Sequence, residues 1–85
     1  MKRYRIEIAP RVAKDLTTLP RAIRLRVESA IDALSADPRP PGVKKLVGED
    51  AYRIRISDYR VIYEITDAAL VVLVVRVRHR KEVYR

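Results

Sequence analysis

The stretch Ala51-Tyr-Arg-Ile-Arg-Ile-Ser-Asp-Tyr-Arg-Val-Ile-Tyr-Glu-Ile65 decides the fold, because charged and apolar residues alternate over much of it on either side of Ser57-Asp58. A side-chain period of two is typical of strands whose two faces differ, so residues 52–56 and 59–65 are predicted strands. Ser57-Asp58 between them predicts a tight turn and therefore an antiparallel hairpin. After a second turn at residues 66–68, residues 70–77 are apolar on both faces of a strand, which predicts a central third strand.

The first half of the chain predicts one more strand and two helices. Alternation over residues 4–8 indicates a strand, and helical spacing of apolar residues indicates a helical hairpin over residues 10–36, interrupted at Leu19-Pro20. A proline-rich connector follows at residues 38–42. The order of strand, two helices and three strands predicts an α+β domain, with the helical hairpin on one face of a small antiparallel sheet.

Length and composition bound the class of protein. A chain of 85 residues predicts one domain, residues 1–85. The absence of cysteine and the single histidine argue against disulfides and zinc sites, so no metal or cofactor is expected. The longest apolar run, residues 68–75, is far shorter than the roughly 20 residues that cross a bilayer, and the N-terminus lacks the apolar segment of a signal peptide. We expect a cytoplasmic protein without membrane contact.

The charge of the chain points to a polyanionic partner. The formal net charge is +8, which attracts nucleic acid, acidic proteins or anionic surfaces. Strand parity puts Arg53 and Arg55 on one face of the sheet, and the hairpin turn can bring Arg60 to the same side. The helices should cover the opposite face, where Tyr52, Ile54, Ile56, Val61 and Tyr63 enter the core. An ordinary solvated basic surface is the simpler interpretation of the same arginines.

The hairpin and the last strand together resemble the RelE toxins of type II toxin–antitoxin modules. The specific parts are Tyr59-Arg60 and the tail from His79-Arg80 to Val83-Tyr84, whereas the helices match in order and length. The resemblance implies a RelE-like β-α-α-β-β-β fold and a toxin that cuts messenger RNA in the ribosomal A site, which inhibits translation. It implies a metal-independent endoribonuclease, held inactive by an acidic RelB-like antitoxin in a hetero-oligomer.

The resemblance assigns catalytic roles to a set of basic residues and one tyrosine: Arg53, Arg55, Arg60, Arg80 and Tyr84. RNA cleavage without a metal must deprotonate the 2′-hydroxyl, stabilise the phosphorane and protonate the leaving oxygen. Guanidinium forks suit phosphate, which makes Arg53 and Arg60 phosphate clamps and Arg80 a stabiliser or proton donor. Arginine is a poor base, so Tyr84 is expected to act as the base or to stack on a codon base. Arginines stand where the best-studied member has lysines, and the segment before Tyr84 is shorter.

Further cations are predicted to contact RNA without catalysing its cleavage: Lys44, Lys45, Arg76, Arg78, His79 and Lys81. Arg76 and Arg78 could equally be docking charges for the antitoxin. Strand alternation turns His79 away from its arginine neighbours, which favours a structural role. Arg60 could simply pair with Glu64 or Asp58.

Two other functions share the same fold. A ParE-like inhibitor of DNA gyrase would act by binding, and a degenerate toxin would only bind its antitoxin and repress their operon. A protein that acts by binding alone does not need the five catalytic positions, and their presence favours the ribonuclease.

Overall fold

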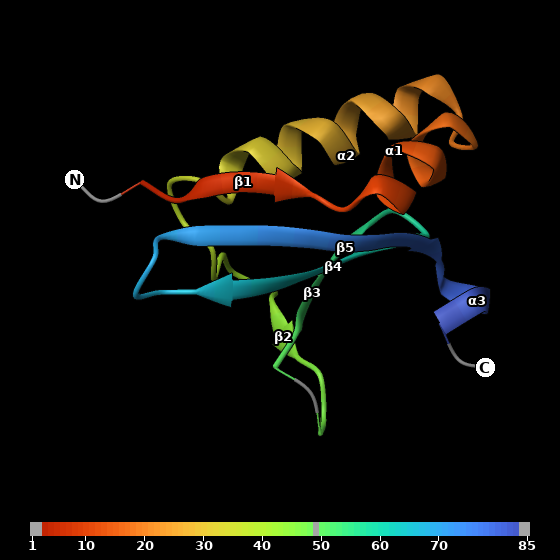
Figure 1. Ribbon diagram of the computed structural model, residues 1–85. Helices are drawn as coiled ribbons and strands as arrows, with labels where there is room; N and C mark the ends of the chain where they lie inside the picture. The colour runs from red at the N-terminus through yellow and green to blue at the C-terminus, as the bar shows by residue number, and fades with distance from the viewer. Residues whose placement is uncertain (1–2, 49, 84–85) are drawn as a thin grey trace.

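The computed structural model describes residues 3–48 and 50–83 as one layer of helices on one sheet (Figure 1). Its elements in chain order are β1 (Arg5–Ile8), α1 (Pro10–Thr17), α2 (Arg21–Ala33), β2 (Lys44–Lys45), β3 (Tyr52–Ile56), β4 (Tyr59–Thr66), β5 (Val71–His79) and α3 (Arg80–Val83). The predicted α+β class and the order of the main elements are confirmed. α2 ends at Ala33, a little before the expected limit of the helical hairpin.

The sheet differs from the prediction in two respects. Its strand order is β1-β5-β4-β3-β2, and β1 pairs with β5 in parallel, so the sheet is mixed rather than antiparallel. The remaining pairs are antiparallel. Parallel neighbours need a long crossover, and almost the whole chain lies between β1 and β5. The short strand β2 was not predicted, because two successive lysines carry no alternating apolar pattern.

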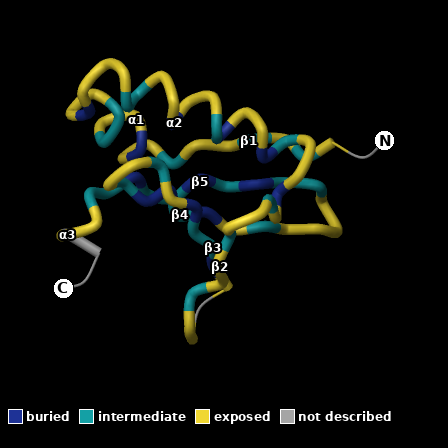
Figure 2. Tube along the Cα trace, turned by 180° about the vertical axis from the view of Figure 1, so that it is seen from behind, coloured by how far each residue is buried: buried dark blue, intermediate teal, exposed yellow. Residues whose placement is uncertain are grey.

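The core lies between the helical layer and the sheet. In Figure 2, α2 is coloured largely as exposed, whereas β4 and β5 in the middle of the sheet are largely buried or half-buried. Val27 and Ile31 of α2 and Leu34 just after it pack on Val61 and Tyr63, all at most 2% exposed. The expected core positions on β3 and β4 are confirmed, with Ile54 buried and Tyr52 and Ile56 half-buried at the core margin.

A β-bulge in β5 decides which of its residues face the helices. The pairing passes from Ile62↔Arg76 directly to Tyr63↔Val74, which leaves Val75 as one extra residue on β5. A bulge of this kind reverses the parity of the strand beyond it. Val74 before the bulge and Val77 after it are therefore both buried, while Arg76 and Arg78 turn to the face away from the helices.

The proline-rich connector is tied across one end of the sheet. The buried Tyr63 donates a hydrogen bond from Oη to the Pro38 carbonyl at 2.7 Å. Arg39 holds Asp67 through two bonds of 3.2 and 3.0 Å, and Tyr4 donates to the same carboxylate at 2.6 Å. These contacts lead the chain back to the sheet, where β2 pairs with β3.

Candidate functional site

Six cations gather on the face of the sheet that the helices leave open. Cross-strand partners project to the same side of a sheet, so the register defines two rows, Lys44–Arg53–Ile62–Arg76 and Arg55–Arg60–Arg78. The prediction that three arginines of the central hairpin share a side is confirmed. We call this surface the basic face, and its cations are Lys44, Arg53, Arg55, Arg60, Arg76 and Arg78.

Arg60 occupies the centre of its row and is 1% exposed, which makes it the one buried charged residue among residues 3–48 and 50–81. A buried guanidinium is costly unless hydrogen bonds compensate it. Its Nη1 donates to the carbonyl oxygen of Arg80 at 3.5 Å. Arg60 therefore links β4 to the first residue of α3, while Arg55 is exposed beside it and Arg53 half-exposed.

Arg80 stands where β5 ends and α3 begins. Its backbone N–H donates to the Asp58 carbonyl at 2.8 Å, which joins it to the β3–β4 turn. Its side chain is 57% exposed, and its Nε lies 3.9 Å from an Asp58 carboxylate oxygen. α3 turns away from the helical layer (Figures 1 and 2). Tyr84, the expected base or stacking residue, lies outside the described residues.

α1 takes the place of β1 along the second half of β5. The Ala9 N–H donates to the Val74 carbonyl at 2.9 Å, and Arg11 Nε donates to the Val75 carbonyl at 3.0 Å. The Asp15 carboxylate accepts the Val77 N–H at 3.0 Å and lies 3.3 Å from Arg76 Nε. The side chains of Arg11 and Asp15 thus hydrogen-bond backbone groups at the edge of β5 that would otherwise need water as a partner. Sequence reasoning missed Asp15, because a single acid on a helix gives no signal of a distant strand.

Three of the expected RNA contacts lie away from the basic face. His79 pairs with Tyr59 across the strands, with ring centroids 5.2 Å apart in an edge contact, and alternation puts both on the helical side. Its Nδ1 accepts the backbone N–H of Lys81 at 3.2 Å, while Lys81 itself is exposed in α3. Lys45 pairs with Tyr52, whereas its neighbour Lys44 pairs with Arg53. Lys45 therefore projects from the opposite side of the sheet to the basic face.

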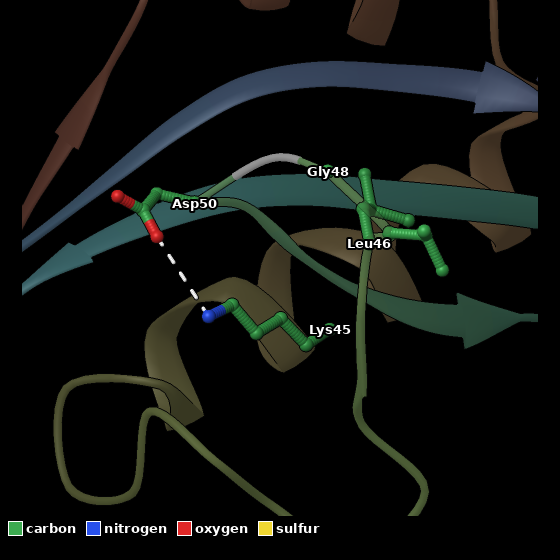
Figure 3. Close-up of a pocket in the computed structure, with 5 residues that line it drawn as sticks. Lys45, Leu46, Gly48 and Asp50 are labelled. Carbon is green, nitrogen blue, oxygen red and sulfur yellow. Dashed lines mark ion pairs between the residues drawn. The ribbon is translucent and has the colours of Figure 1, made fainter.

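The loop between β2 and β3 forms a shallow hollow of about 520 Å³ beside Lys45 (Figure 3). Lys45 Nζ lies 3.7 Å from the Asp50 carboxylate, and Val47 is fully exposed at the loop. Both side chains of this ion pair are exposed to solvent, so the pair contributes little to stability. The hollow contains none of the expected catalytic residues.

Comparison with known proteins places this arrangement in a family. The family model described as the ParE toxin of the type II toxin–antitoxin system parDE matches residues 6–84. The chain belongs to the RelE/ParE superfamily of toxins. This RelE/ParE toxin is 33% identical over 86 residues to toxin RelG of Mycobacterium tuberculosis, covering 96% of this chain and 97% of the relative.

Solved structures of RelE toxins have the same fold as this RelE/ParE toxin. RelE in the RelE–RelB complex of Pyrococcus horikoshii superposes with a TM-score of 0.82 at 36% identity, over 91% of this chain and 94% of that chain. Isolated Escherichia coli RelE superposes with a TM-score of 0.77 at 28% identity, over 95% of this chain and 90% of that chain. The fold and family are thus those that the hairpin and tail indicated.

Two further findings concern this toxin within residues 3–48 and 50–83. No helix there is long and apolar enough to span a membrane. Among the side chains that the structure describes, no three histidine, cysteine or acidic residues lie together in a way that could hold a metal ion.

Proposed function

We propose that this type II toxin is a metal-independent endoribonuclease that cuts messenger RNA in the ribosomal A site. The observation that carries the proposal is the basic face, which brings Arg53, Arg55 and Arg60 together beside Arg80. These are four of the positions at which the RelE resemblance implies catalysis. A toxin that acts on ribosomes would work in the cytoplasm.

The accessible arginines suit phosphate binding and charge stabilisation. Arg53 and Arg55 alternate on β3 and both project from the basic face, where planar guanidinium groups can hold successive phosphates. Arg80 stands at the margin of this face with more than half of its side chain exposed, so it would stabilise the phosphorane or protonate the leaving oxygen. Divalent metals prefer carboxylate and carbonyl oxygens, whereas this surface presents cations. Proton transfer would fall to protein groups, and we propose Tyr84 as base or stacking residue.

Arg60 would contribute in a different way from its neighbours. Because it is buried and donates to the Arg80 carbonyl, it fixes the position of α3 relative to β4. Its charge would act on the bound phosphate at short range, without direct exposure to solvent. The same contact would set the start of the tail that carries Tyr84.

The partner that restrains the toxin would be an acidic RelB-like antitoxin. The P. horikoshii toxin and its E. coli counterpart have both been solved in complexes of RelE with RelB. A chain of net charge +8 would bind RNA indiscriminately when free. An acidic segment that covers the basic face, or that displaces α3, would prevent this in a toxin–antitoxin hetero-oligomer.

The decisive experiment is induced expression followed by mapping of messenger RNA ends. We expect translation to stop, with new 5′ ends inside translated regions. Arg53→Gln combined with Arg55→Gln should abolish both effects. Arg21→Gln combined with Arg26→Gln, two exposed positions of α2, removes the same two charges from the other layer and should leave toxicity unchanged. Intact messages during growth arrest would overturn the ribonuclease proposal.

A second candidate is a ParE-like inhibitor of DNA gyrase. The observation that favours it is the family model, which is named for ParE. Under this alternative, expression would block DNA supercoiling while messages stay whole. A supercoiling assay with purified gyrase, run beside the message mapping, separates the two functions.

A further inference from the structure

The contact between Asp15 of α1 and Arg76 of β5 joins the helical layer to the basic face. One carboxylate oxygen of Asp15 accepts the Val77 N–H at 3.0 Å and lies 3.3 Å from Arg76 Nε. The Asp15 side chain is 15% exposed and that of Arg76 is 28% exposed. An ion pair this sheltered is screened less by solvent than an ordinary surface pair.

Arg76 is anchored at one end of its guanidinium group. Its Nε is buried without an aligned hydrogen bond, so the Asp15 carboxylate is the group that compensates its charge. Among the side chains that the structure describes, the two Nη nitrogens of Arg76 enter no hydrogen bond, and the guanidinium is held at Nε by Asp15. With Nε held from the side of α1, these two donors are the ones available to a ligand on the basic face.

A carboxylate at position 15 is not required merely to accept a hydrogen bond from the edge of β5. A neutral amide or hydroxyl could accept the Val77 N–H equally well. A negative charge next to a surface that binds a polyanion lowers the local potential and by itself weakens binding. A long side chain that is mobile before binding loses conformational entropy when it binds. By fixing the direction of the Arg76 guanidinium in advance, the Asp15 carboxylate reduces this entropy cost, which offsets the weaker electrostatic attraction.

We propose that Asp15 is a positioning residue that holds Arg76 for contact with a phosphate of bound RNA. The inference rests on the proposed function in so far as RNA is the ligand, but it does not require cleavage. Asp15 touches no substrate and acts through Arg76. It would add one ordered phosphate contact at the end of the row Lys44–Arg53–Ile62–Arg76.

The test measures binding of the full chain to a fluorescein-labelled single-stranded RNA with 2′-O-methyl groups, which cannot be cut at the 2′-hydroxyl. Fluorescence anisotropy over a range of salt concentrations gives the affinity and its salt slope. We expect Asp15→Asn to weaken binding about three- to fivefold, the worth of one partly exposed charged contact. The salt slope should fall by about 0.7, the value for one phosphate on a single strand.

Two controls separate positioning from charge and from folding. Asp32→Asn removes an exposed carboxylate of α2 and should leave binding unchanged or slightly tighter. In an Arg76→Gln background, Asp15→Asn should cause no further loss, because its target is gone. The melting temperature of Asp15→Asn should stay near that of the parent, since the amide oxygen can still accept the Val77 N–H.

Several results would overturn the inference. If Asp15→Asn tightened RNA binding as Asp32→Asn does, the charge of Asp15 would act only by repelling RNA. An equal loss with and without Arg76 would show that Asp15 acts through the fold. Absence of salt-dependent RNA binding by the parent chain would also refute it. Messages that stay whole in cells while the expected binding pattern holds would remove the ribonuclease proposal alone.

Discussion

Tyr63→Phe tests whether the connector contact holds the domain together. Tyr63 is fully buried, and its Oη donates to the Pro38 carbonyl at 2.7 Å. Phenylalanine keeps the ring but leaves a buried carbonyl without its donor. The loss should be about 1–2 kcal/mol of unfolding free energy, which lowers Tm by roughly 5–15 °C for a domain of this size.

The same variant should change the response to alkaline pH. Burial is the main cause that raises the pKa of Tyr63 to about 12, whereas an unfolded tyrosine titrates near 10. Between about pH 10 and 12 the folded protein keeps the Tyr63 hydroxyl proton while the unfolded chain loses it. The contribution of the Tyr63 hydroxyl to stability is therefore complete below about pH 10 and is lost as pH rises through about 12. A difference of about two pKa units corresponds to a loss of at most about 2–3 kcal/mol. Because phenylalanine does not titrate, the gap between parent and variant should narrow in that interval.

Urea denaturation followed by circular dichroism, at neutral pH and between pH 10 and 12, measures both effects. Tyr59→Phe is the matched control: Tyr59 is half-buried, and within the described residues its hydroxyl enters no hydrogen bond. We expect the control to differ little from the parent. A Tyr63→Phe variant as stable as the control, or a gap that stays constant with pH, would refute the reasoning.

Three other perturbations probe the core, the connector and the basic face. Leu34→Ala removes a side chain that is 1% exposed and should cost about 2–5 kcal/mol in urea denaturation. Arg39→Gln breaks the exposed ion pair with Asp67 and should cost less than about 1 kcal/mol, with a smaller effect at high salt. Arg53→Gln should lower the salt slope of single-stranded RNA binding by about 0.7, whereas Arg21→Gln on α2 should leave the slope unchanged.

The alternating residues of the central hairpin were enough to predict its strands and the common side of Arg53, Arg55 and Arg60. They could do so because Arg53, Arg55, Arg60 and Glu64 alternate there with apolar or aromatic residues, so parity is visible in the sequence. Residues 70–75 lack that contrast, since a run of apolar residues is compatible with either parity. The bulge at Val75 was therefore invisible, although it decides the direction of every later residue in β5.

Contacts between distant elements were the other part that the sequence concealed. Asp15 meets β5 only because β1 stops at Ile8 and leaves the adjacent strand edge to α1. The burial of Arg60 likewise depends on where α3 begins, which no local pattern around Arg60 specifies. Both features arise from the assembled sheet, and each couples a candidate site residue to an element remote in sequence.

The bulge connects the stability of the domain to its chemistry. Without it, a regular alternation from Val72 and Val74 would continue into the core with Arg76 and Arg78, and would expose Val77. Burying two guanidinium groups beneath the helices would cost several kcal/mol each, so the extra residue at Val75 is required by the core. The same residue directs both arginines to the basic face, where the Asp15 carboxylate meets Arg76. The cations at this end of the site are therefore a consequence of how β5 fills the core.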